Sequence, residues 1–254
     1  MARILSLLRR LYLTVYNWAV FLGWSQVLFL AVKTLKDSGH EHVYNAVEKP
    51  LQLAQTAAVL EILHGLVGGY IFSFSNFFPF CLLLLFSWCF QICLVLCNDE
   101  GLVRSPITAT LPQIGSRLYL TWIILYSFPE IRSHFLVTSL VISWSITEII
   151  RYSFFGVKEV LGFAPSWLMW LRYSTFLLLY PTGISSEVGL VYFALPYIKG
   201  SEKYCLRMPN KWNFSFDNFY AAILVLGIYI PGSPHMYSYM LGQRKKALSK
   251  SKRE

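Results

Sequence analysis

The sequence predicts an all-α, polytopic membrane protein, and three observations lead to that fold class. The 254 residues are 56% hydrophobic and only 14% charged, whereas a soluble domain usually carries about 25% charge. The apolar residues come in long runs rather than at amphipathic spacing, which is typical of membrane spans. The basic residues gather at the two ends of the chain. This composition excludes a disordered chain and a nucleic-acid-binding protein.

Six apolar runs are long enough to cross a bilayer at about 1.5 Å of rise per residue. The first run follows a basic segment and has no small-residue cleavage site, so we interpret it as a retained span rather than a signal peptide. An even number of spans places both ends of the chain on one side of the membrane. The runs are Tyr12–Val32, Leu51–Gly68, Gln113–Phe128, His134–Phe155, Trp167–Leu195 and Phe219–Met240.

The distribution of positive charge predicts cytosolic termini. Nine of the 22 Lys and Arg residues lie in the two tails, and cytosolic segments carry such an excess. The basic tail at 241–254 contains Lys252 and Lys250, which are third and fifth from the end. This dilysine pattern is typical of membrane proteins returned to the endoplasmic reticulum. The alternative is a solvated basic tail without a sorting role.

An extra apolar segment at about 69–101 has a composition foreign to the rest of the chain. It contains four of the five cysteines. No His or carboxylate accompanies them at ligand spacing, so no metal site is predicted. The segment is long enough to cross the membrane, but its Pro79 and nearby polar residues also fit a re-entrant or membrane-surface segment. A seventh crossing would place the two basic tails on opposite sides.

Ionisable groups inside the spans are costly and therefore indicate a partner or a function. Glu61 and His64 are three residues apart on one helical face. Glu148, Arg151 and Tyr152 also share a face, with the acid preceding the base. For both groups, an ion pair within the helix bundle is the alternative to a role in substrate binding.

The span Trp167–Leu195 carries the pattern with the most chemical content. Tyr173, Tyr180 and Glu187 are spaced by seven residues, which keeps them within about 40° of one helical face. Gly183 lies on that face and leaves room for a ligand, and the proline at 181 is expected to bend the helix. A carboxylate can accept a proton and a phenol can donate one. Such a pair suits elimination of water beside an acyl carbonyl, although pairs of an aromatic residue and an acid are also common in membrane bundles.

At these residues the chain resembles the very-long-chain (3R)-3-hydroxyacyl-CoA dehydratase family, also called protein tyrosine phosphatase-like. The matching stretches follow one another in order along nearly the whole chain. They are Val47-Glu-Lys-Pro-Leu51, Leu60-Glu-Ile-Leu-His64, Trp144-Ser-Ile-Thr-Glu-Ile-Ile-Arg-Tyr-Ser-Phe154, Leu179-Tyr-Pro-Thr-Gly-Ile-Ser-Ser-Glu187 and Asn213-Phe-Ser-Phe-Asp217.

The resemblance implies a six-span endoplasmic reticulum enzyme that converts 3-hydroxyacyl-CoA to trans-2-enoyl-CoA and water during fatty-acid elongation. The family's catalytic Tyr and Glu fall on Tyr180 and Glu187, with acid and base roles that can be exchanged. No cofactor is implied. The implied partners are membrane lipid and the other elongase enzymes: a condensing enzyme, a ketoreductase and an enoyl reductase. Basic residues at the cytosolic mouth, such as Arg104, Arg117 and Lys158, are candidate contacts for the CoA phosphates or ordinary membrane-flanking charges.

The chain departs from the family in one place. The family runs from the stretch ending at Gly68 directly into Leu102, so residues 69–101 look like an insertion. We therefore expect one integral membrane domain over 1–254, with this insertion and the basic tail at 241–254. The insertion is either a membrane-surface elaboration or translated intronic sequence.

Two other functions remain as alternatives. The first is a catalytically silent scaffold of the elongase complex, or a binding protein of the phosphatase-like type. A phosphatase itself is disfavoured because Gly65 follows His64, where a cysteine phosphatase places its thiolate. The second is a small transporter that relays protons through Glu61, Glu148 and Glu187; the chain lacks the internal repeat that many transporters carry.

Overall fold

The computed structural model describes residues 2–59 and 107–251, with side chains over 10–59 and 113–249. These residues form two compact units, Met1–Leu51 with Phe128–Glu254 (unit 1) and Gln52–Ser127 (unit 2). The described residues of unit 1 form helices joined by loops, with one isolated bridge between Leu206 and Phe216. Its elements are α1 (Ala2–Ser38), η1 (His40–His42), the start of α2 (Val43–Ala57), η3 (Pro129–Ile131), α6 (Phe135–Leu161), α7 (Ser166–Ser174), α8 (Phe176–Ser201) and α9 (Asn218–Ser251).

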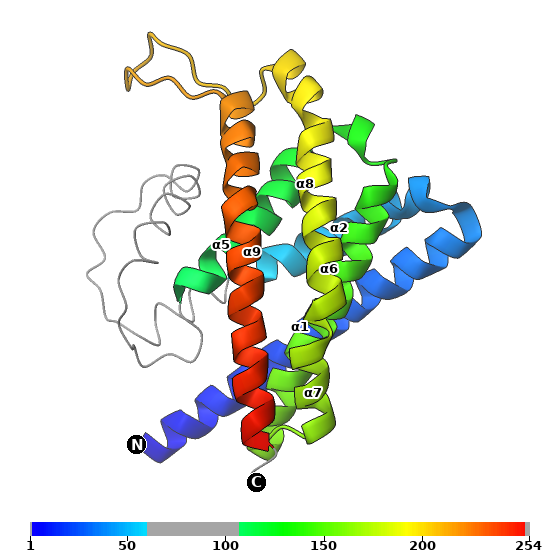
Figure 1. The fold of residues 1–254 in the computed structure, drawn as a ribbon, viewed down its shortest axis with the longest axis vertical. Coiled ribbons are helices and arrows are strands. Elements are labelled where there is room, and N and C mark those ends of the chain that lie inside the picture. Colours follow the sequence, from blue (N-terminus) through cyan, green and yellow to red (C-terminus); the bar gives the residue numbers. More distant parts are fainter. Residues whose placement is uncertain (1, 60–106, 252–254) are drawn as a thin grey trace. The chain divides into compact units, whose positions relative to one another are not determined.

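Helices α1 and α6 pack against each other in opposite directions (Figure 1). Near the start of α1, the Arg10 guanidinium donates to the backbone carbonyl of Glu159, at 2.8 Å, near the end of α6. At the other end, the Thr138 hydroxyl donates to the carbonyl of His40, at 3.3 Å. The two helices approach closely where Gly156 faces the ring of Trp18. This pair forms one side of unit 1.

Small polar residues join α6 to α8. The Ser186 hydroxyl donates to that of Ser139 at 3.0 Å, and the hydroxyls of Ser143 and Thr182 lie 3.2 Å apart. Small side chains let helix backbones approach, and hydroxyl groups hydrogen-bond between helices in a medium without water. The order of these contacts shows that α6 and α8 are antiparallel.

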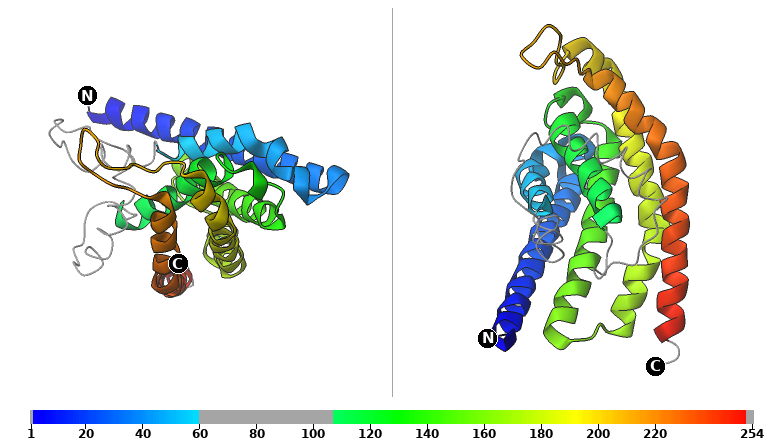
Figure 2. Two further views of the ribbon diagram at one scale, coloured as in Figure 1. Left: turned by 90° about the horizontal axis from the view of Figure 1, so that it is seen from above. Right: turned by 90° about the vertical axis from the view of Figure 1, so that its left-hand side faces the viewer.

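Helix α9 lies along α8, and Figure 2 shows that α9 is curved. Pro231 and Pro234 lie inside it. Each proline removes one backbone N–H from the helical ladder, which is a common cause of bending. The curved helix follows the side of α8 that carries Tyr180 and Glu187.

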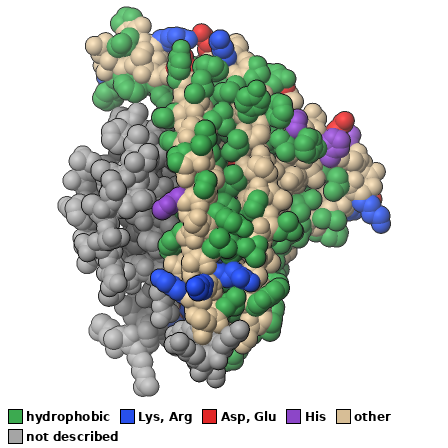
Figure 3. Space-filling model, viewed as in Figure 1, with side chains coloured by type: hydrophobic (Ala, Val, Ile, Leu, Met, Phe, Trp, Pro, Cys, Tyr) green, Lys and Arg blue, Asp and Glu red, His purple; other side chains and the backbone are tan. Residues whose placement is uncertain are grey.

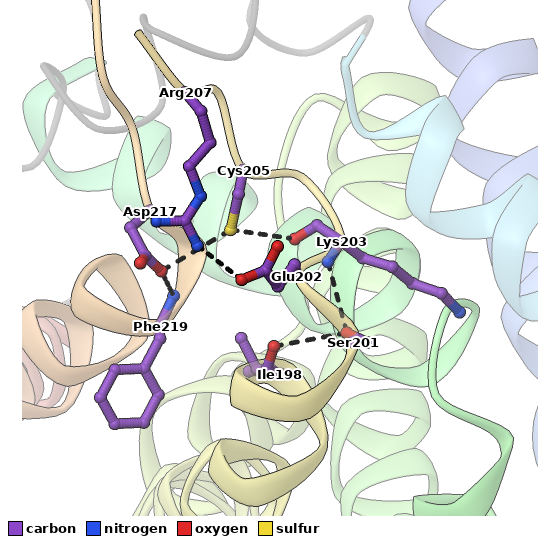
Figure 4. Close-up of polar contacts among 8 residues, drawn as sticks. All are labelled: Ile198, Ser201, Glu202, Lys203, Cys205, Arg207, Asp217 and Phe219. Atoms are coloured by element: carbon purple, nitrogen blue, oxygen red, sulfur yellow. Dashed lines mark hydrogen bonds and ion pairs between the residues drawn. The ribbon is translucent and has the colours of Figure 1, made fainter.

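The connection between α8 and α9 is a polar loop (Figure 4). The Asp217 carboxylate accepts a hydrogen bond from the Phe219 backbone N–H at 2.9 Å, which caps the start of α9. The Cys205 thiol lies 3.6 Å from the same carboxylate oxygen. The Arg207 guanidinium pairs with the Glu202 carboxylate at 2.7 Å. These contacts close the loop at the end of unit 1 opposite to the start of α1.

The outer surface of α8 and α9 is apolar, as Figure 3 shows for one face. A soluble protein rarely exposes a contiguous apolar surface of this kind, whereas a lipid-facing helix requires it. By length and composition, four helices of the described residues are candidate membrane spans: Arg10–Ser38, Phe135–Leu161, Ser166–Ser201 and Asn218–Ser249. The predicted all-α membrane class is therefore supported, with four of the six predicted spans.

The two other predicted spans involve unit 2. Leu51–Gly68 continues beyond the described residues, and the segment at 69–101 lies wholly outside them. The Gln113–Phe128 segment is formed by α5 (Ile107–Leu118), a π-helical stretch η2 (Tyr119–Leu125) and the turn that follows. Within unit 2, Ile114 and Leu118 pack with Ala58 in a small apolar cluster.

The close approach of α1 and α6 yields a test. A Cβ atom at Gly156 would lie 3.1 Å from two atoms of the Trp18 ring, whereas a Cβ atom at Gly23 in α1 would meet nothing within 4 Å. We expect Gly156→Leu to lower the stability of the detergent-solubilised protein by about 1–3 kcal/mol because it overpacks the interface. Gly23→Leu is the matched control. Equal melting temperatures for the two variants would contradict this packing.

Candidate active site

The carboxylate of Glu187 is buried where α6, α8 and α9 meet. Its Oε1 atom accepts a hydrogen bond from Nε1 of Trp144 in α6, at 2.9 Å. Its Oε2 atom accepts one from the hydroxyl of Tyr229 in α9, at 2.6 Å. The carboxylate is thus held from two sides by donors on two helices.

The other predicted catalytic residue, Tyr180, is partly buried and also faces α9. Its hydroxyl donates to the backbone carbonyl of Ser233 at 3.2 Å. Its ring stacks on that of Tyr237, with 5.9 Å between the ring centroids. Tyr229, Ser233 and Tyr237 follow one another at intervals of four residues, which places them on one face of α9. Tyr180 and Glu187 therefore face the same side of the same helix.

Gly183 lies between these two residues on α8, three positions after Tyr180 and four before Glu187. Gly183 is buried, yet a Cβ atom there would meet no atom within 4 Å. The predicted room beside this glycine is therefore consistent with the structure. This open space lies between a phenol and a carboxylate on α8.

Tyr173 lies on α7, which precedes α8 within the same candidate membrane span. The predicted span Trp167–Leu195 is divided into α7 and α8 at Thr175, five residues before Tyr180. The Thr175 hydroxyl donates to the carbonyl of Leu171 at 2.9 Å, a contact that often bends helices. Pro181 lies inside the continuous helix α8, and the division at Thr175 was not predicted from the proline. Next to Tyr173, the Arg172 guanidinium lies 4.5 Å from the ring centre of Phe155 in α6.

Glu148, Arg151 and Tyr152 come together on α6 as their spacing predicted. The Arg151 guanidinium pairs with the buried carboxylate of Glu148 at 2.7 Å and donates to the Tyr152 hydroxyl at 3.0 Å. Glu148 is one helical turn beyond Trp144. The ion pair therefore lies beyond the Glu187 site on α6, toward the end of unit 1 that carries the start of α1.

Other predicted site residues are outside the described part of the chain. Glu61, His64 and Lys252 are among them, and Lys250 is described by its backbone alone. In the described residues, no three His, Cys, Asp or Glu side chains gather into a group that could hold a metal ion.

The sequence-based interpretation missed Trp144 and Tyr229, which hold the Glu187 carboxylate. Trp144 opens one of the matched stretches, but its spacing relative to Glu187 carries no local signal. Tyr229 is 42 residues from Glu187 in the chain and is one of several tyrosines in α9. Their contact with Glu187 arises from helix packing, so it can be recognised only in the folded structure.

Comparisons with known proteins identify the family of the chain. A family model described as protein tyrosine phosphatase-like protein, PTPLA, matches residues 89–250. No solved structure matches the chain.

Curated relatives match over nearly all of the chain. It is 70% identical over 254 residues to the very-long-chain (3R)-3-hydroxyacyl-CoA dehydratase PASTICCINO 2 of Arabidopsis thaliana, which covers 100% of both chains. It is 36% identical over 239 residues to the very-long-chain (3R)-3-hydroxyacyl-CoA dehydratase 2 of Homo sapiens, covering 94% of this chain and 81% of the human protein. The chain therefore belongs to the protein tyrosine phosphatase-like family, which includes the very-long-chain (3R)-3-hydroxyacyl-CoA dehydratases.

Proposed function

We propose that this chain is a very-long-chain (3R)-3-hydroxyacyl-CoA dehydratase, a hydro-lyase that forms trans-2-enoyl-CoA. The observation that carries the proposal is the buried carboxylate of Glu187 on the α8 face that also bears Tyr180 and open space at Gly183. The names of the relatives support an enzyme over a catalytically silent scaffold. Neither group requires a cofactor for the chemistry.

The reaction breaks the C2–H and C3–O bonds of the substrate and forms the C2=C3 double bond. In our assignment, Glu187 accepts the C2 proton. Tyr180 donates its hydroxyl proton to the leaving 3-hydroxyl group, which departs as water. The proton then returns from Glu187 to Tyr180, so that the enzyme ends as it began. The opposite assignment of acid and base uses the same two groups.

The substrate's two halves fit the two environments of unit 1. The acyl chain requires a hydrocarbon environment, and the apolar outer surface of the helices faces the hydrocarbon of the bilayer. The CoA phosphates require cations and water. One end of unit 1 carries the start of α1, the end of α6 and the end of α9, with Arg10, Lys158 and Arg244 among its basic residues. We assign this end to the CoA moiety.

Replacement of the two proposed catalytic groups tests the function. We expect Tyr180→Phe and Glu187→Gln each to lower the dehydration of a 3-hydroxyacyl-CoA by about 100-fold or more, because general acid–base groups contribute about 10²–10⁴-fold. The assay measures enoyl-CoA formation by microsomes containing each variant at equal abundance. Tyr192→Phe is a matched control, since Tyr192 lies on α8 with 62% of its surface exposed. Rates near wild type for both variants would overturn the assignment.

We further propose residence in the endoplasmic reticulum membrane, with both termini in the cytosol and with the other elongase enzymes as partners. The antiparallel packing of α1 with α6, and of α8 with α9, places the start of α1 and the end of α9 at one end of unit 1 (Figure 1). Because α1 and α6 are antiparallel, the chain between them must cross the membrane an even number of times. In the six-span topology the predicted spans Leu51–Gly68 and Gln113–Phe128 supply two crossings, provided that residues 69–101 do not cross.

Reporters of glycosylation test this topology. We expect a glycosylation acceptor fused after residue 254 to remain unmodified in microsomes, because the end of α9 is cytosolic. The same reporter inserted into the α8–α9 loop, with Asn213→Gln to remove the native Asn-Phe-Ser acceptor, is expected to be modified because that loop lies at the opposite end of unit 1. Modification of the C-terminal reporter would place the tail in the lumen and contradict the topology.

A further inference from the structure

We propose that Trp144 and Tyr229 are positioning residues that fix the Glu187 carboxylate for proton transfer. This inference rests on the proposed function, because it concerns the group that exchanges the substrate's proton. Its basis is the pair of hydrogen bonds from Trp144 Nε1 to Oε1, at 2.9 Å, and from the Tyr229 hydroxyl to Oε2, at 2.6 Å.

The two contacts differ in what they constrain. Trp144 lies on α6 and Tyr229 on α9, so the donors reach the carboxylate from two different neighbours of α8. Each donor forms a hydrogen bond with a different oxygen of the carboxylate. Because a carboxylate is planar, one hydrogen bond to each oxygen restrains the rotation of its plane. A single donor would leave the plane of the group able to rotate.

Both donors are themselves buried. Trp144 is 2% exposed and Tyr229 is 8% exposed. An indole N–H can only donate, so at Oε1 the carboxylate must act as acceptor. Rigid supporting residues of this kind hold a reacting group within the small range of geometries that proton transfer tolerates.

Tyr229 also links the two proposed catalytic groups. It lies one helical turn before Ser233, whose carbonyl accepts the hydrogen bond of Tyr180. The same turn of α9 therefore sets the position of the carboxylate through a side chain and that of the phenol through the backbone. A change at Tyr229 that spares the backbone is expected to disturb only the carboxylate.

Tyr229→Phe and Trp144→Phe remove one donor each and keep an aromatic ring. We expect either variant to lower kcat by about 10- to 100-fold, the range that loss of orientation by a fraction of an ångström produces, with KM within about twofold of wild type. Activity is measured as enoyl-CoA formation from a defined 3-hydroxyacyl-CoA, normalised to protein abundance in the membrane. Tyr220→Phe serves as the control on α9, since Tyr220 is 69% exposed.

A second measurement separates positioning from general destabilisation. Glu187→Asp keeps the carboxylate but withdraws its oxygens by one methylene from the Tyr229 hydroxyl. If Tyr229 acts through Glu187, Tyr229→Phe lowers kcat about 10-fold or more in the wild-type background and less than about threefold in the Glu187→Asp background. Equal losses in the two backgrounds would show a purely structural role and overturn the inference.

The outcomes also distinguish this inference from the proposed function. Wild-type kcat in both Tyr229→Phe and Trp144→Phe, together with an inactive Glu187→Gln variant, would remove the positioning role and leave the dehydratase intact. Full activity of Glu187→Gln would instead overturn the catalytic assignment itself. If the Tyr229→Phe protein does not accumulate, the same comparison is made with Trp144→Phe in the wild-type and Glu187→Asp backgrounds. This variant tests the inference at the other oxygen of the same carboxylate.

Discussion

A single buried carboxylate connects the three helices on which the site depends. Charged groups in hydrocarbon are costly unless donors satisfy them, and Glu187 receives one hydrogen bond from α6 and another from α9. These bonds fix α8 between its two neighbours at the level of the site. The requirement to satisfy this one group therefore also determines which faces of α6 and α9 turn inward. Small residues at the α6–α8 contact, such as Ser139 and Ser186, allow the approach that brings Trp144 within reach.

Helix α9 contributes more to the site than its sequence indicates. Its Tyr229, Ser233 and Tyr237 form a continuous stripe along α8. The two prolines in this region remove backbone N–H groups, and the resulting curvature follows α8. A straight helix of the same composition would diverge from α8 over this length. The prolines are thus part of how Tyr180 and Glu187 come to share one neighbour.

The fold class and the local side-chain groups could be predicted from the sequence, because both depend on short-range periodicity. Long apolar runs indicate spans, and a three-residue interval correctly brings Glu148 to Arg151. The partners of Glu187 could not be predicted in this way. Trp144 is 43 residues away from it in the chain, and no residue interval relates helices that meet only through packing.

The interruption at Thr175 was also missed, for a different physical reason. Proline is the residue that sequence rules associate with bends, whereas a threonine hydroxyl that bonds to the preceding turn leaves no distinct signature. It divides the predicted span into α7, which carries Tyr173, and α8, which carries Tyr180 and Glu187. Periodicity calculated over one continuous helix does not include such a division.

The positions of groups along α7 and α8 bear on how the proposed substrate lies in the site. Arg172 stands nearest the end of unit 1 that carries the termini, Tyr180 follows, and Glu187 lies deeper. In a 3-hydroxyacyl-CoA the phosphates come first, then the thioester, and then C2 and C3, followed by the apolar chain. In the proposed pose the CoA moiety lies at the basic end and the acyl chain in hydrocarbon, so that C2 and C3 fall between the levels of Tyr180 and Glu187. Gly183 lies between these two residues on α8, and the absence of a side chain there leaves room for the proposed reacting carbons beside the carboxylate that α6 and α9 hold in place.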